Sequence, residues 1–142
     1  MRTFYPLLLF SALFLFTGCS KDVLKSYDKR VLGTWKISDV SRYGFNGSDA
    51  LPFKENDLLT FGEDGALTLQ RTGTTWQGSW DIQRVHNGDD DESKALALTV
   101  INLADQQVRS DYFNDMAFTG TNHFKAFINY NTRVYVYRFS RQ

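Results

Sequence analysis

Side chains with catalytic potential are few in this sequence, and they form no recognisable motif. His86 and His123 are the only histidines, and no Gly-x-Ser-x-Gly stretch occurs. Acyl-transfer chemistry needs a nucleophile, a base and an orienting acid that are brought together. Asp111, Tyr112 and Asp115 form a polar cluster, but carboxylates of this kind are common in solvated turns. We therefore expect a protein that is not an enzyme and that uses no cofactor.

A metal site has equally little support. Metal sites need several convergent His, Cys or carboxylate ligands, and His86 and His123 form no paired spacing such as H-x-H. The stretch Asn87 to Glu92, NGDDDE, has the alternate carboxylates of a calcium loop. It lacks the central glycine and the distal glutamate of an EF-hand. We interpret this stretch as a solvated hairpin loop, the two histidines as surface residues, and the protein as one without a metal.

Cys19 is the only cysteine, and the residues before it have the layout of an export signal. One basic residue, Arg2, precedes the run from Leu7 to Phe16, which is apolar except for Ser11, and the small residues Thr17 and Gly18 follow. That order is typical of a secretory signal peptide with a small-residue cleavage site. The run is shorter than the roughly 20 residues that a membrane-spanning helix needs. We therefore expect residues 1–18 to be removed.

The tetrad Phe16-Thr17-Gly18-Cys19 resembles a bacterial lipobox, although lipoboxes prefer Leu where Phe16 stands. The resemblance implies that Cys19 is lipidated, with acyl chains such as palmitate, and becomes the first residue of the mature protein. The alternative is an ordinary signal peptide that leaves a free thiol, which would be a liability in an oxidising compartment. The lipid interpretation places the protein in the outer membrane, on its periplasmic face or at the cell surface.

Length and charge constrain the mature chain. Removing residues 1–18 leaves 124 residues with 15 Lys and Arg against 16 Asp and Glu, which is the size of one domain. No basic field is present, which argues against nucleic acid as a partner. The whole chain divides into a signal peptide (1–18), a lipidated cysteine and tether (19–30) and a folded domain (31–142).

The sequence pattern of the folded domain predicts a series of antiparallel strands. After Gly33 the pattern has a period of two, with Trp35 and Ile37 on one face, which is typical of a strand with one solvated face. Short runs separated by turn residues continue at 57–61, 66–71, 74–84, 95–103, 107–113, 124–130 and 133–139. This pattern predicts an all-β protein behind one or two helical turns. We expect the connection 44–56, which contains Pro52, to cover one end of a barrel.

Four of these segments resemble a known family. The stretch Leu32-Gly33-Thr34-Trp35-Lys36-Ile37 resembles the Gly-x-Trp opening of lipocalins. Leu59 to Gly65 (L-x-F-x-x-D-G) and Gly78-Ser79-Trp80 (G-x-W) are similar to strands two to four of bacterial lipocalin-like lipoproteins. Residues 135–139, YVYRF, resemble their closing strand. The resemblance implies an antiparallel up-and-down β-barrel of about eight strands, lipocalin-like, with a short N-terminal helical turn.

The same resemblance assigns a closed base to the barrel. It implies that Trp35, after Gly33, plugs this base beneath a basic side chain from the end of the last strand. Arg138 and Arg141 both lie near that position, on opposite faces of the strand. A guanidinium stacked on an indole contributes about 0.5–2 kcal/mol. The sequence leaves the choice between the two arginines open.

The interior has two interpretations. The alternation of apolar and polar residues predicts that thirteen side chains face the interior, namely Trp35, Ile37, Leu59, Phe61, Leu67, Leu69, Trp76, Trp80, Leu96, Leu98, Val100, Phe124 and Ile128. These side chains either fill the barrel or line a pocket for one small ligand, because about eight strands enclose room for either. Gly78 lies between Trp76 and Trp80 on the same face, where the missing side chain either relieves crowding or opens a cleft. The candidate ligand-binding residues are Trp76, Gly78, Trp80, Leu98 and Phe124.

These features predict a lipid-anchored cell-envelope protein that binds a small hydrophobic ligand in the barrel. The alternative is a filled barrel that docks an envelope protein through its loops, with no ligand, because a fold does not fix a function. Exposed aromatic residues clustered at one rim would favour a partner or a cavity mouth. The candidates for such a rim are Tyr43, Phe45, Phe53, Tyr112 and Phe113.

Substituting Cys19 tests the anchor. In Cys19→Ala we expect the protein to leave the membrane fraction or to remain unprocessed, because no thiol can accept a lipid. Membrane fractionation with the intact mass of the product measures both effects. A variant that stays with membranes and has the processed mass of the parent would exclude lipidation at Cys19.

Overall fold

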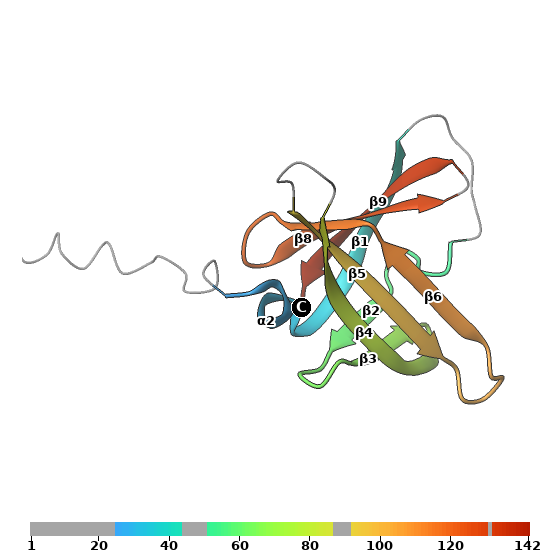
Figure 1. The fold of residues 1–142 in the computed structure, drawn as a ribbon. Coiled ribbons are helices and arrows are strands. Elements are labelled where there is room, and N and C mark those ends of the chain that lie inside the picture. Colours follow the sequence, from blue (N-terminus) through green and yellow to red (C-terminus); the bar gives the residue numbers. More distant parts are fainter. Residues whose placement is uncertain (1–24, 44–50, 87–91, 131) are drawn as a thin grey trace, which may run out of the picture.

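The structure is a computed structural model that describes residues 25–43, 51–86, 92–130 and 132–142 (Figure 1). The predicted signal peptide, the lipobox with Cys19, most of the acidic loop after His86 and the side chains of Tyr43 and Phe45 lie outside the described residues.

One short helix precedes nine strands. The helix is α2 (Tyr27–Val31). The strands are β1 (Gly33–Tyr43), β2 (Leu58–Phe61), β3 (Ala66–Arg71), β4 (Thr74–His86), β5 (Glu92–Ile101), β6 (Val108–Phe113), β7 (Asp115–Phe118), β8 (His123–Tyr130) and β9 (Arg133–Arg141).

The nine strands form a single sheet in the order β6-β5-β4-β3-β2-β1-β9-β8-β7, and every pair is antiparallel. The prediction of an all-β, up-and-down antiparallel barrel behind a short helical turn is therefore confirmed. β7 is the strand that the sequence pattern missed, because it has only four residues and follows β6 after the single residue Asn114.

The barrel is nearly closed, and its seam lies between β6 and β7. The first and last strands pair along most of their length, from Trp35 opposite Arg141 to Tyr43 opposite Val134. β6 pairs with β5 and β7 pairs with β8, but no pairing joins β6 to β7 among the described residues. The one gap in the sheet thus falls between two strands that are consecutive in sequence.

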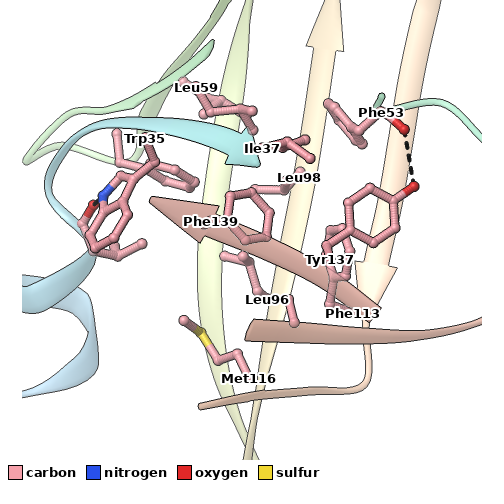
Figure 2. Close-up of a cluster of buried hydrophobic side chains, with 14 of the residues drawn as sticks. Trp35, Ile37, Phe53, Leu59, Leu96, Leu98, Phe113, Met116, Tyr137 and Phe139 are labelled. Carbon is pink, nitrogen blue, oxygen red and sulfur yellow. Dashed lines mark hydrogen bonds between the residues drawn. The ribbon is translucent and has the colours of Figure 1, made fainter. Parts of the chain in front are cut away.

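The interior is packed with apolar side chains (Figure 2). All the side chains that alternation placed inward belong to this core, although Trp80 is only partly buried. Phe124 stacks on Phe139 with ring centroids 4.2 Å apart, and Phe113 meets Tyr137 edge to face at 5.0 Å. Most of the barrel is therefore filled by its own side chains.

Residues 51–57, the described part of the connection before β2, lie over one end of the barrel. Phe53 is 1% exposed, and its carbonyl oxygen accepts a hydrogen bond from the Tyr137 hydroxyl at 3.1 Å (Figure 2). Phe113 is also buried. Neither residue therefore contributes to an exposed aromatic rim, whereas Tyr112 is 43% exposed.

The other end, the base, is closed by Trp35, which is fully buried and donates from its indole nitrogen to the Val31 carbonyl at 2.6 Å. The Arg141 guanidinium lies 4.4 Å from the centre of the indole ring. Arg141 also donates to the carbonyl oxygens of Leu32 at 2.8 Å and Arg30 at 2.7 Å. Arg138 is exposed and forms an ion pair with Asp39. Arg141 is therefore the basic residue that covers Trp35.

Gly33 makes this arrangement possible. Its φ of +106° is strained for any residue with a side chain, and a Cβ there would lie 3.1 Å from Arg141 Nη1. Glycine thus lets the chain turn from α2 into β1 directly beneath the guanidinium.

The base assignment predicts unequal losses of stability for three substitutions. Trp35→Ala should lower the free energy of unfolding by about 3–5 kcal/mol, as large-to-small core substitutions do. Arg141→Ala should lower it by about 1–3 kcal/mol, because the stacking and two hydrogen bonds are lost. Arg138→Ala should lower it by less than about 1 kcal/mol, because exposed ion pairs contribute little.

Urea melts measure all three values. Equal losses for the two arginine variants, or a Trp35→Ala variant within about 1 kcal/mol of the parent, would contradict this account of the base.

Candidate ligand-binding site at the polar end of the barrel

The end of the barrel opposite Trp35 has a polar interior. Strand alternation turns Arg42 inward beyond Val40, and Arg42 lies opposite Tyr135 on β9. It likewise turns Arg109 and Asp111 to the same side of β6 as the buried Phe113. We call this region the polar end; it comprises Arg42, Asp57, Arg71, Trp76, Arg109, Asp111 and Tyr137.

One ion pair in the polar end attaches the covering segment to the sheet. Asp57 is 1% exposed, and it accepts hydrogen bonds from Arg71 Nε at 2.7 Å and from Arg71 Nη2 at 2.5 Å. Arg71 Nη2 also donates to the Pro52 carbonyl at 2.9 Å. The hydrogen bonds with Asp57 raise the pKa of the Arg71 guanidinium. These two residues satisfy each other, and their role is structural.

Arg109 reaches from β6 over the neighbouring strand β5 to Trp76 on β4. Its guanidinium lies 4.7 Å from the centre of the Trp76 ring, and Nη1 donates to the Pro52 carbonyl at 3.3 Å. Arg109 Nε and Trp76 Nε1 are buried and have no hydrogen-bond partner. The stacked pair therefore presents two unused N–H donors.

Asp111 is an unpaired carboxyl two residues beyond Arg109 on the same face of β6. Its Oδ2 atom is buried without a partner, and burial raises the pKa of this carboxyl to about 7. Burial also raises the pKa of the Tyr137 hydroxyl, and the nearby Asp111 and Asp57 carboxylates add to that effect.

Arg42 completes the set, because its Nε and Nη1 atoms are buried without a partner. Within the described part of the chain, every buried side-chain polar atom that lacks a hydrogen bond belongs to Arg42, Trp76, Arg109 or Asp111. A buried polar group without a partner costs about 1–3 kcal/mol, and more if it is charged. All five atoms belong to residues of the polar end, which makes this end the candidate site for a bound molecule or ion.

The seam gives solvent access to this end. Residues 128–130 of β8 pair with β9 on one side, but no strand of the described chain pairs with them on the other. A depression of about 440 Å³ lies there, lined by Pro52, residues 107–111 and Tyr130. Arg109 and Asp111 are thus both interior residues and part of the wall of an open depression.

The five residues that the sequence singled out as ligand-binding candidates do not surround a common space. Trp76 and Leu98 lie toward the polar end, where Leu98 is opposite Asp111, whereas Phe124 packs against Trp35 at 4.8 Å near the base. Trp80 donates to the Gly62 carbonyl at 3.1 Å. A Cβ on Gly78 would lie 1.9 Å from the Thr99 carbonyl oxygen, so the backbone of β5 occupies that space.

The sequence interpretation missed Arg42, Arg109 and Asp111. It grouped Asp111 with Tyr112 and Asp115 in a solvated turn, but Asp111 faces inward while Tyr112 faces out. The alternation of Arg109, Asp111 and Phe113 was the signal that was available, because it places two charged residues on the face of a buried phenylalanine.

The other chemical candidates stay on the surface. His86 and His123 are exposed at strand ends. Among the described residues no three His, Cys, Asp or Glu side chains are grouped closely enough to hold a metal ion. The described helix is also too short and too polar to cross a bilayer.

Comparisons of the chain with protein-family models, with curated proteins and with solved structures find no match.

The raised pKa of Asp111 predicts a pH-dependent effect of Asp111→Asn. From about pH 4 to pH 7 the folded protein binds a proton on Asp111 that the unfolded chain has released. Stability therefore falls as the pH rises through this window, and the full loss is present above pH 7. The Asp111→Asn variant has no such loss of stability, because asparagine does not ionise. We expect the variant to match the parent near pH 4 and to be more stable by about 2 kcal/mol at pH 8.

Urea melts across this pH range measure the difference, and Asp81→Asn, at an exposed position, is the control. A difference between Asp111→Asn and the parent that stays constant from pH 4 to pH 8 would show that Asp111 titrates normally.

Proposed function

We propose that this chain is a lipid-anchored, lipocalin-like protein of the cell envelope whose barrel binds a small amphiphilic molecule at the polar end. One observation carries the proposal: the five buried polar atoms without partners all lie at this end. A bound molecule with polar atoms would satisfy them. A barrel that served only as a scaffold would gain stability from apolar residues at the same positions.

The surroundings favour a ligand that also has an apolar part. Leu98 and Val100 of β5 lie opposite Asp111 and Arg109 of β6, and both are buried. The Trp76 ring adds a flat apolar surface beneath the Arg109 guanidinium. A ligand that enters through the seam would therefore meet charged groups and apolar walls together.

The position of the described N-terminal end suits an anchored binding protein. The described chain begins beside α2, at the Trp35 end of the barrel (Figure 1), and Arg42 lies seven residues along β1 from Trp35, or about 23 Å. Cys19 and Lys25 are six residues apart, a separation that spans about 20 Å at most. An anchor on Cys19 would hold the base near the bilayer and leave the polar end on the far side.

The alternative function, docking of an envelope partner, has its own supporting observation. Leu103 is 70% exposed and Val108 is 61% exposed, and both lie on the hairpin that joins β5 and β6. Two large apolar side chains exposed on one hairpin offer a contact point for another protein.

Native mass spectrometry of the full chain, extracted from membranes in a mild detergent, tests the proposed function. We expect a one-to-one non-covalent adduct of small-molecule mass on the parent and on Arg138→Gln, because Arg138 lies outside the barrel. Arg109→Gln should lose the adduct, because it removes a cation from the site.

Two results would favour docking instead. One is the absence of a small-molecule adduct on the parent. The other is a co-purified envelope protein that Leu103→Ser with Val108→Ser releases and Arg109→Gln retains.

A further inference from the structure

We propose that the polar group of the ligand is an acid, either a carboxylate or a phosphate-type anion, which Arg42 and Arg109 bind together inside the polar end. This inference rests on the proposed function, because it names the chemical class that the same site takes.

The unpartnered atoms are mostly donors. Two belong to Arg42, one to Arg109 and one to Trp76, and all four are N–H groups; only Asp111 Oδ2 is an acceptor when ionised. A complementary ligand must therefore present several acceptor atoms. Carboxylate and phosphate oxygens are acceptors only, so they meet this requirement without adding donors that the site cannot use.

The charge of the polar end favours an anion. Arg71 is neutralised by Asp57, whereas Arg42 and Arg109 form no ion pair with any described carboxylate. Arginine side chains carry a positive charge in proteins. Buried cations require a counter-charge, and charge-assisted hydrogen bonds are about twice as strong as neutral ones.

Asp111 does not supply that counter-charge. It is one carboxyl for two arginines, and burial raises its pKa to about 7, so that it is partly protonated at neutral pH. In its protonated form Asp111 becomes a further donor toward a bound acid. An incoming anion stabilises this form, because two adjacent negative charges repel each other.

Side-chain NMR of the full chain in non-ionic detergent micelles tests the inference directly. The probes are hexanoate, hexyl phosphate and hexanamide, which share one apolar chain and differ in the polar group. The readout is the Nε–H resonances of Arg42 and Arg109 and the indole N–H of Trp76. The Nε–H of Arg138, which pairs with Asp39 outside the barrel, is the internal control.

We expect saturable shifts at Arg42, Arg109 and Trp76 with at least one of the two acids, and binding at least ten times tighter than that of hexanamide. Arg42→Gln should weaken acid binding at least tenfold, whereas Arg138→Gln should change it less than twofold. Tighter binding of hexanoate would indicate a free carboxylic acid, and tighter binding of hexyl phosphate would indicate a phosphate head group.

Two results would overturn the inference, and only the second would also exclude the proposed function. Hexanamide that binds as tightly as both acids would exclude an acid-specific site but keep the proposed function. No shift with any probe, together with the absence of a native adduct, would exclude both. Because the parent alone gives these results, the test holds even if Arg42→Gln does not fold.

Discussion

The period of two along each strand is the constraint on which this structure depends. In a nearly closed barrel, every second residue of every strand must face inward, whatever its chemistry. Toward the base these positions hold aromatic and aliphatic side chains, which pack densely around Phe124 and Phe139. At the other end the same rule turns Arg42, Arg109 and Asp111 into the interior. Both the stability of the barrel and its candidate site follow from this rule.

The two ends use arginine in different ways. At the base, Arg141 covers Trp35 and is satisfied by two backbone carbonyls. At the polar end, Arg109 lies over Trp76 in a similar stack, but its Nε atom and the indole nitrogen stay without partners. An arginine stacked on a tryptophan thus has its hydrogen bonds made at the base, whereas the equivalent stack at the polar end has N–H groups without partners. That contrast gives the base a structural role and makes the polar end the candidate binding site.

Much of the fold was predictable from the sequence because alternation and turn chemistry are local. The runs around Trp35, Leu69 and Leu98 indicated their strands, and their inward faces form the core. The four-residue β7 was missed because so short a run carries little pattern. The choice between Arg138 and Arg141 follows from the pairing of β1 with β9, which sets Arg141 opposite Trp35, and from the turn at Gly33. The polar end was missed because its charged residues come from separate strands, which only the closing of the barrel brings to one end.

The central claim is that the unpartnered polar atoms form a site for an acidic ligand. A high-resolution crystal structure of the protein with hexanoate tests this claim most directly. The account predicts that the carboxylate oxygens lie about 2.7–3.2 Å from nitrogens of Arg42 and Arg109, with the alkyl chain against Leu98 or Val100. A structure in which ordered water alone satisfies these atoms at saturating hexanoate, or in which Arg42 and Arg109 pair with protein carboxylates, would contradict it.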